Sequence, residues 1–393
     1  MTDWSLPPEW LNALLAFLYE AQQGLRTVLH TLGLVPEVHG QPAWPFGWRV
    51  AGELLTKEPG HARRVAVTLA CVALSLLCLL LAVAWRRRRR VVLVLAVLPL
   101  LVAPWPSARL LFAPAWATSF HRSPTGFSAA SIVAGQAVYQ QHCLRCHGAD
   151  GRGEGPDAAR LPMWPPTLNN TLMWRRLDGE LFHHVRAGRR GRDGAVTMPG
   201  FADALRDEQV WQVLDYLQAN ASGQTLREAG AWVYPVRLPD APVRCRQGRR
   251  QTLTDFTGQR VRLTVFAPGA ALAQDDPRID TVVLGAPPGA DVACRLDSPE
   301  AADALALVLG VPLDELPGHQ VLADRDGWLR VRGQPGSAWS EDDLVCKAST
   351  VPQAGSTGAG PPPGTALPEA GLDALIRRMD AEPVRARRGG FPH

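Results

Sequence analysis

The sequence lacks a strong excess of charge of either sign. Its 41 Lys and Arg residues against 37 Asp and Glu residues leave a net charge of +4 over 393 positions. Nucleic-acid binding by phosphate contacts normally shows as a clear basic excess. We therefore expect no nucleic-acid partner.

Cysteine is scarce as well. The seven cysteines stand at positions 71, 78, 143, 146, 245, 294 and 346, too few for a disulfide scaffold in a chain of 393 residues. Only Cys143 and Cys146 have C-x-x-C spacing, so no second such pair is available to complete a zinc site. Cys71 and Cys78 lie on one face of an apolar segment and are interpreted as packing residues.

Long apolar runs, by contrast, are present. Val65–Trp85 has no charged residue and would span about 30 Å as a helix, the thickness of the hydrocarbon core. Val91–Ala108 is also uncharged, but Pro99 and two further prolines shorten or kink it. We predict a transmembrane helical hairpin over residues 61–120. The alternative is one span followed by a buried core helix.

Five arginines, Arg86–Arg90, separate the two apolar runs. Because cytoplasmic loops carry the Lys and Arg excess, this turn is expected inside and both chain ends outside. Residues 1–60 have neither the basic start nor the uninterrupted apolar stretch of a signal peptide. Apolar residues from Leu11 to Leu32 recur at helical spacing. They predict an amphipathic helix, followed by an aromatic loop, that lies on the membrane or packs on the hairpin.

The segment 128–222 is predicted to be a small all-helical domain. Helical spacing appears before Cys143, over Asp178–Gly188 and over Leu205–Asn220, with Gly- and Pro-rich loops between them. A few short helices over about ninety residues bury little apolar area, so such a domain usually needs a disulfide, metal or cofactor.

The motif Cys143-x-x-Cys146-His147 points to that cofactor. Chance would produce it about 0.003 times in a chain of this composition, and the pattern is typical of covalent haem attachment. A zinc site would need two further ligands, and a thioredoxin-like dithiol would open a helix, whereas a glycine-rich loop follows here. We predict one haem c, with His147 as the proximal iron ligand.

The sixth iron ligand must come from elsewhere in the chain. The candidates are Met163, Met173, Met198, His183 and His184. Met198 is preferred because Pro199 stiffens its loop just before the last helix. Four arginines precede this loop and are expected to pair with haem propionates or to dock an acidic partner, a solvated basic loop being the alternative: Arg186, Arg189, Arg190 and Arg192.

From "GQAVYQQHCLRCHGADGRGEGP" to "TMPGFADALRDEQVWQVLDYLQA" the chain resembles a class I c-type cytochrome domain. It is most similar to the single-haem modules of membrane-bound bacterial electron carriers, among them cytochromes fused to copper-resistance D-type membrane proteins, whose four-histidine membrane core is not evident here. The resemblance implies that two helices cross at Gly135, Tyr139, Trp211 and Tyr216. It also implies that Pro165 or Pro166 offers a carbonyl to His147.

The function implied is one-electron transfer by a membrane-anchored carrier without enzymatic activity. Filled axial positions leave no site for substrate. We expect it in a bacterial inner membrane, with the haem and C-terminal domains in the periplasm and with protein donors and acceptors such as a respiratory complex or terminal oxidase. The alternative is a haem-based redox sensor or a copper-handling assembly factor.

Residues 232–350 alternate strand and helix patterns, which predicts an α/β domain. The order of elements resembles the thioredoxin-like superfamily. Gly269–Gln274 nevertheless has no cysteine where a dithiol would stand, so a binding or structural module is expected. A disulfide is expected here, with Cys245–Cys346 the preferred pair. Residues 351–393 are predicted to be a flexible linker, a short helix and a disordered basic tail.

Overall fold

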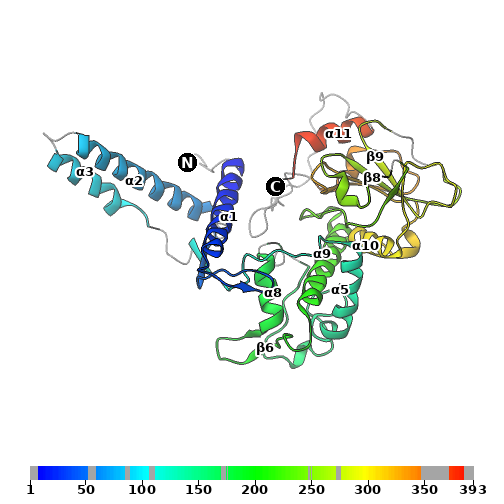
Figure 1. The fold of residues 1–393 in the computed structure, drawn as a ribbon, viewed down its shortest axis with the longest axis horizontal. Coiled ribbons are helices and arrows are strands. Elements are labelled where there is room, and N and C mark those ends of the chain that lie inside the picture. Colours follow the sequence, from blue (N-terminus) through cyan, green and yellow to red (C-terminus); the bar gives the residue numbers. More distant parts are fainter. Residues whose placement is uncertain are drawn as a thin grey trace. The chain divides into compact units, whose positions relative to one another are not determined.

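The computed structural model describes residues 8–51, 59–84, 89–105, 111–169, 174, 176–246, 248, 250–270, 276–346 and 371–384. The chain forms two compact units, and the boundary between them falls after His121 (Figure 1). The predicted multi-domain organisation is present, and it contains helices and a mixed sheet.

The first unit begins with helix α1 (Pro8–Thr31), which confirms the predicted N-terminal helix. Two short ladders follow: β1 (Glu37–Val38) pairs with β2 (Gln41–Pro42), and β3 (Trp48–Val50) pairs with β4 (Phe112–Pro114). Gln22 on α1 exchanges hydrogen bonds of 2.8 and 3.1 Å with the backbone of Val50, and Arg26 donates to the Phe120 carbonyl at 2.8 Å. These bonds tie α1 to the segments before and after the hairpin.

The hairpin consists of α2 (Pro59–Ala84) and α3 (Arg89–Val102), which pack against each other. By length and composition Arg64–Ala82 is long and apolar enough to cross a membrane. The second helix has only 14 residues and contains Pro99. At 1.5 Å per residue it extends about 21 Å, less than a hydrocarbon core. It ends at Val102, because Pro104 disfavours the helical conformation of Ala103 before it. Most of the arginine turn lies outside the described residues.

The second unit begins with the predicted helical segment. It comprises α5 (Ala129–His142), α6 (Leu144–His147), the 3-10 turn η3 (Ala158–Arg160), α8 (Asp178–Ala187), the β5–β6 hairpin (Arg189–Arg190 and Val196–Met198) and α9 (Asp207–Ala229). The predicted helices are present. The last one continues nine residues beyond Asn220, to a left-handed Gly230.

The close crossing of α5 and α9 confirms the implied packing. A Cβ on Gly135 would clash with the Gln212 carbonyl, so only glycine allows this approach. Tyr139 and Tyr216 lie with ring centroids 5.1 Å apart, and Trp211 belongs to the same apolar cluster.

The α/β part contains a six-stranded mixed sheet in the order β12-β11-β8-β9-β10-β7. Its strands are β7 (Arg244–Cys245), β8 (Val261–Val265), β9 (Asp280–Leu284), β10 (Cys294–Leu296), β11 (Gln320–Ala323) and β12 (Leu329–Gly333). The strands β8, β9 and β10 are parallel and the other pairs antiparallel. The predicted helix is α10 (Pro299–Leu309), capped by Ser298, and short 3-10 turns cover Leu253–Phe256, Leu313–Glu315 and Glu341–Asp343. The thioredoxin-like assignment stays a prediction.

The expected disulfide pairing is wrong. Cys245 is bonded to Cys294, and Cys346 is a buried free thiol. The sheet order explains the difference. Cys294 on β10 lies directly opposite Cys245 on the edge strand β7. Cys346 instead hydrogen-bonds the backbone of Arg330 on β12, which is the opposite edge.

The C-terminal helix, predicted to belong to a separate tail, is part of the fold. Helix α11 (Leu372–Ala381) packs on the sheet with Leu375 fully buried. The buried Arg330 guanidinium donates to the carbonyls of Cys346 and Met379 at 3.1 and 3.3 Å. Apolar side chains and the buried Arg330 therefore hold α11 on the sheet. The local sequence pattern does not reveal this docking.

The helical and α/β parts of the second unit share a hydrophobic core. Ile132 of α5 and Ala219 and Leu226 of α9 lie in one cluster with residues of the sheet and of α10. The Trp232 indole donates to the Val308 carbonyl at 3.2 Å. In Figure 1, α10 accordingly lies beside α5 and α9. The extra turns of α9 form because α10 covers them.

Candidate functional site

The two motif cysteines and His147 are held on a single turn at the end of α5. The Cys143 amide donates to the Tyr139 carbonyl at 2.8 Å, and the amides of Cys146 and His147 donate to the Cys143 carbonyl at 3.1 and 2.9 Å. Both cysteines are half-buried free thiols. Burial, together with Cys146, raises the pKa of Cys143 to about 12. The sequence motif thus becomes one rigid group of two thiols and one imidazole.

A buried tyrosine fixes the end of this turn. The Tyr139 hydroxyl donates to the Gly148 carbonyl at 2.7 Å, and Gly148 has a positive φ of 79°. Burial, with the neighbouring Tyr216, raises the pKa of Tyr139 well above its ordinary value, so the hydroxyl stays a neutral donor. This hydrogen bond orients the backbone directly after His147.

The glycine-rich loop that follows folds back over the turn. The amides of Gly153, Gly155 and Asp157 donate to the carbonyls of His147, Cys146 and Arg145 at 2.8, 3.2 and 2.8 Å. Added Cβ atoms on Gly153 and Gly155 would clash with the Pro165 and Arg145 carbonyls. Glycine is required at both positions because two backbones touch there.

The His147 imidazole is half-buried, and its surroundings favour the neutral form. Burial lowers its pKa, and the nearby Pro166 carbonyl opposes this effect. Among the described residues its Nδ1 is buried without a hydrogen-bond partner. The Pro166 carbonyl, one of the two implied partners, is therefore nearby, but a well-formed bond to Nδ1 is not made. A neutral imidazole is the form that ligates iron.

Apolar side chains that pack on the same cluster as Cys143 are not fully covered. They pack on the core of α5, α8 and α9 and stay partly buried: Leu144, Leu168, Leu181, Val185 and Phe201. An apolar surface of this kind, next to two thiols and a neutral imidazole, fits a flat, largely apolar cofactor that the thiols anchor. The residues present therefore fit a haem.

Met198 ends strand β6, where it pairs with Arg189 of β5. Its loop is anchored to α8, because the Phe201 amide donates to the Val185 carbonyl at 3.0 Å. A Cβ on Gly188 would be 2.6 Å from the Met198 carbonyl, so the backbones are in contact. Met198 as iron ligand stays a prediction.

The other ligand candidates have different surroundings. Met163 is 59% exposed, and Met173 lies outside the described residues. His183 and His184 are neighbours on α8 with ring centroids 5.7 Å apart. Burial lowers the pKa of His184 to about 3, with help from Arg189 and Arg176.

The predicted arginine cluster is divided by the fold. Arg186 pairs with Asp207 at 2.5 Å, and Arg190 donates to the Gly194 carbonyl at 3.1 Å. Arg189 instead lies near Arg176. Burial lowers the pKa of Arg189, and the charge of Arg176 lowers it further. Neither Arg176 nor Arg189 has a carboxylate partner among the described residues. Two neighbouring guanidinium groups, one of them on the strand that pairs with Met198, suit an anionic group, for example the propionates of a haem.

Sequence reasoning missed an amide network that joins the loop to α9. Gln224 donates to the Asp150 carbonyl at 2.7 Å and accepts from Asn169 at 2.9 Å, and Asn220 reaches the same carbonyl at 3.5 Å. Asn220 and Gln224 are four residues apart, so they share one helical face, and this spacing was the only signal in the sequence. The signal was overlooked because the helix was predicted to end at Asn220.

Asp215 on α9 was also missed. It is 4% exposed and accepts hydrogen bonds from Thr125 and, at 2.6 Å, from Ser131. Burial outweighs these bonds and raises its pKa from 3.8 to about 6. A carboxyl whose pKa is higher in the folded state adds most stability below its unfolded pKa, and this contribution falls as the pH rises through the folded value.

We therefore expect the wild type to lose up to about 3 kcal/mol relative to Asp215→Asn between pH 4 and pH 7, as about two pKa units imply. The free energy of unfolding of both proteins, measured by denaturant at pH 4, 5, 6 and 7, gives this difference. Titration of all other groups cancels in the comparison. Parallel stability profiles would show that Asp215 is not buried as described.

No group of three or more His, Cys, Asp or Glu side chains that could hold a metal occurs in the part of the chain that the structure describes. A cluster of such donors around Cys143 and Cys146, as a zinc site requires, is thus not found there.

Comparison with known proteins agrees with this geometry. Residues 130–217 match the family "Cytochrome C oxidase, cbb3-type, subunit III". Cytochrome c550 of Pseudomonas aeruginosa is 30% identical over 104 residues, 26% of this chain and 64% of that protein. Thiosulfate dehydrogenase of Allochromatium vinosum is 31% identical over 103 residues, 25% of this chain and 33% of that protein. The chain therefore spans less than two thirds of either relative.

A solved chain of the Kuenenia stuttgartiensis reducing HAO-like protein complex is 22% identical, covering 27% of this chain and 50% of that one. With a TM-score of 0.21, this likeness supports no conclusion about the fold. The family match and the relatives identify the helical part as a c-type cytochrome domain, and its cofactor is covalently bound haem c. This domain suits electron transfer, while the name of the second relative leaves enzymatic activity open.

Proposed function

We propose that the chain is a membrane-anchored electron carrier that moves one electron at a time through a single haem c. Cys143 and Cys146 would hold the haem, and His147 and Met198 would ligate its iron. The observation that carries the proposal is the single turn that presents two thiols and a half-buried imidazole of lowered pKa beside partly covered apolar side chains.

The residues of this chain would keep the site rigid. Covalent haem supplies an iron that is oxidised and reduced by one electron. Tyr139 and the folded-back glycine loop hold the His147 backbone, and the hydrogen bond from Phe201 to Val185 holds the Met198 loop. A site that is fixed in this way needs little rearrangement when its charge changes. Arg176 and Arg189 would offset the negative charge of the propionates.

An electron carrier differs from an enzyme in having no open coordination position. Ligation by both His147 and Met198 would fill the two axial positions, which supports a carrier without turnover of its own. The copper-handling alternative loses support because Cys294 is engaged in a disulfide.

We propose that α2 and α3 anchor the protein in a bacterial inner membrane. The hairpin exposes many leucines, among them Leu74, Leu80 and Leu95 at 50%, 69% and 51%. The pairing of β3 with β4 brings together the two segments that flank the hairpin. This pairing supports an arrangement with both segments on one side, which the Arg86–Arg90 turn makes the periplasmic side. Protein donors and acceptors, such as a respiratory complex or terminal oxidase, would then meet the haem there.

A redox titration tests this function. For protein matured in a host that attaches haem c, we expect one haem per chain, a single one-electron transition at positive potential, and no carbon monoxide binding by the ferrous form. Thiosulfate should neither reduce the haem at a catalytic rate nor be consumed with an added electron acceptor. Steady thiosulfate oxidation would show an enzyme instead, and carbon monoxide binding would show an open iron position.

A further inference from the structure

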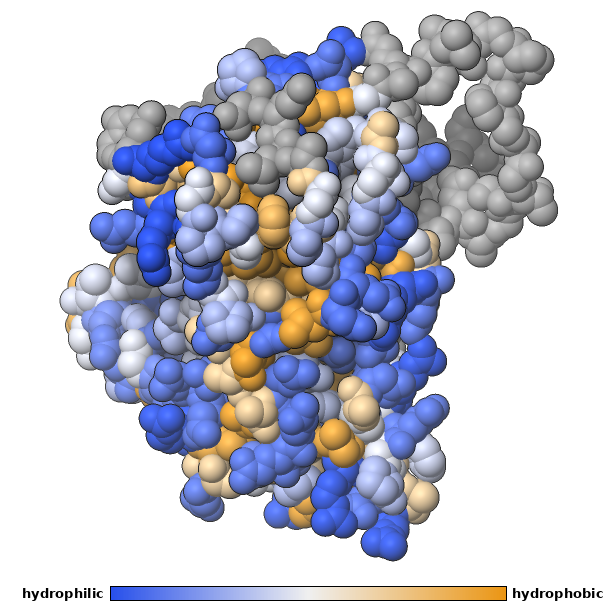
Figure 2. Space-filling model, turned by 90° about the vertical axis from the view of Figure 1, so that its right-hand side faces the viewer, coloured by the Kyte–Doolittle hydropathy of each residue, from blue (hydrophilic) through white to orange (hydrophobic). Residues whose placement is uncertain are grey.

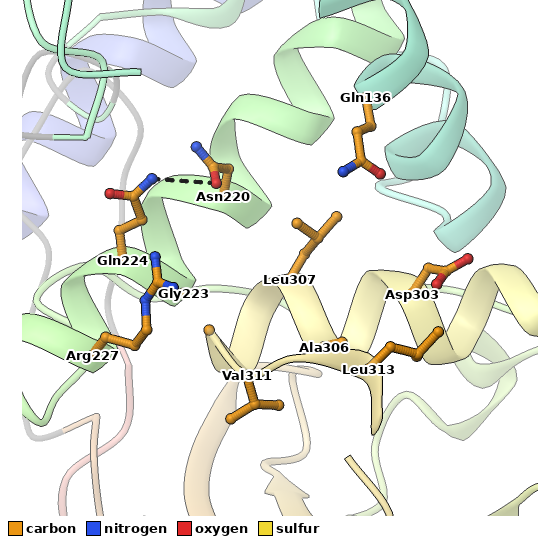
Figure 3. A pocket seen from close by; sticks show the side chains of 11 residues that line it. Gln136, Asn220, Gly223, Gln224, Arg227, Asp303, Ala306, Leu307, Val311 and Leu313 are labelled. Atoms are coloured by element: carbon orange, nitrogen blue, oxygen red, sulfur yellow. Dashed lines mark hydrogen bonds between the residues drawn. The ribbon is translucent and has the colours of Figure 1, made fainter. Parts of the chain in front are cut away.

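A cavity of about 270 Å³ lies where α5, α9 and α10 meet (Figure 3). Its lining comes from α5, from the last turns of α9 and from α10 with the turn that follows it: Gln136, Asn220, Gly223, Gln224, Arg227, Asp303, Ala306, Leu307, Gly310, Val311 and Leu313. Its size is close to the lower end of small-molecule sites.

Close backbone contacts set the shape of this cavity. A Cβ on Gly223 would clash with the Leu307 carbonyl, and one on Gly310, which has a φ of 65°, would clash with the Gly223 carbonyl. The two helices therefore meet through glycine backbones, and side chains are left to line the space beside the contact. Because α9 and α10 pack in one shared hydrophobic core, their positions on either side of the cavity are fixed.

Two of the polar lining residues are already engaged. Gln224 donates to Asn220 at 3.4 Å, the dashed line in Figure 3, and to the Asp150 carbonyl at 2.7 Å. Its carbonyl oxygen accepts from Asn169 at 2.9 Å. These two amides form a wall whose hydrogen bonds are satisfied within the protein.

Three other polar side chains have no such partners. Gln136, Arg227 and Asp303 make no hydrogen bond or ion pair with the described residues. In Figure 3, Arg227 and Asp303 stand on opposite sides of the cavity, with Leu307 and Ala306 between them, and Gln136 extends toward it from α5. A cation and an anion thus face one cavity without pairing with each other.

The surface between these charges is apolar. Leu307, Val311 and Leu313 line it, and Leu313 is 51% exposed. Figure 2 looks at the right-hand side of Figure 1, where α10 lies, and shows hydrophobic residues gathered amid largely hydrophilic surroundings. This arrangement suits a ligand with an anion at one end, a cation at the other and an apolar part between them.

We propose that this cavity binds a small ω-amino carboxylate. Its carboxylate would pair with Arg227, its methylene chain would lie on Leu307 and Val311, and its ammonium group would pair with Asp303, while Gln136 would hydrogen-bond to either end. The assignment does not depend on how the haem iron is ligated.

Isothermal titration of the full holo-protein in detergent tests this proposal. The probes are 4-aminobutyrate, 5-aminopentanoate and 6-aminohexanoate, with hexanoate and hexylamine as compounds that lack one end group. We expect at least one ω-amino acid to bind with a dissociation constant of about 1 mM or lower. Hexanoate and hexylamine should bind at least about tenfold more weakly, because each loses one charge-assisted contact.

Matched variants locate the binding. Arg227→Gln and Asp303→Asn should each weaken it about tenfold, whereas Arg325→Gln, an exposed arginine outside the cavity, should not change it. The proposal is overturned if no ω-amino acid binds, if hexanoate or hexylamine binds equally well, or if neither cavity variant has an effect. Should a variant fail to fold, the comparison of the compounds on the wild type decides.

Discussion

Met198→Ala is expected to leave the haem attached and to remove one of the two ligands of its iron. The thioethers to Cys143 and Cys146 do not depend on Met198, so the colour and the covalent linkage should remain. Loss of the thioether ligand should abolish the weak sulfur-to-iron absorption band at the red end of the ferric spectrum. It should also lower the reduction potential by roughly 0.1 V or more and allow the ferrous form to bind carbon monoxide.

Absorption spectra and a redox titration of the purified variant measure these changes. Met163→Ala is the matched control, because Met163 is 59% exposed on another loop of the same domain and should leave spectrum and potential unchanged. If Met198→Ala keeps the red band, Met198 is not the ligand. Loss of the band in the Met163 variant instead would move the assignment to Met163.

Gly135→Ala is expected to destabilise the second unit by about 3 kcal/mol, the upper part of the range for overpacked cores. The added methyl group would clash with the Gln212 backbone carbonyl, which cannot rotate away as a side chain would. To relieve the clash α5 and α9 would have to move apart, and the tilted ring contact between Tyr139 and Tyr216 would loosen. Because α5 ends in the cysteine motif, the haem environment should loosen with it.

Denaturant unfolding of the holo-protein, followed by far-ultraviolet circular dichroism and by haem absorbance, measures the effect. Ala137→Ser is the control: Ala137 is exposed on the same helix, and its substitution should change stability by less than about 0.5 kcal/mol. Equal stability of Gly135→Ala and the wild type would mean that the two helices are farther apart than described.

Local patterns in the sequence were sufficient for much of this protein. Helical spacing located α5, α8, α9 and α10, and the glycines and prolines marked the loops between them. The cysteine motif named the cofactor, because covalent haem attachment needs two thiols and an imidazole at fixed short spacing. The implied crossing at Gly135 also corresponds to the structure, and the Pro166 carbonyl lies near His147 without a hydrogen bond to its Nδ1.

Long-range contacts decided what local patterns did not contain. The disulfide joins Cys245 to Cys294 because strand order places them opposite each other, and strand order is not visible in cysteine spacing. Helix α11 follows a linker-like stretch of sequence but docks on the sheet through Leu375 and the buried Arg330. The last turns of α9 form because α10 covers them.

The sequence by itself determined the covalent haem cofactor and the apolar length of α2, because both depend on residues that are close neighbours in the chain. Only the tertiary structure decided that the cytochrome and α/β parts share a core, that Asp215 is buried, that Tyr139 is buried beside the motif, and that Arg227 and Asp303 face one cavity. The reason is physical: burial and the pairing of charges depend on which distant segments meet. That outcome depends on the free energy of the whole fold, which no single segment contains.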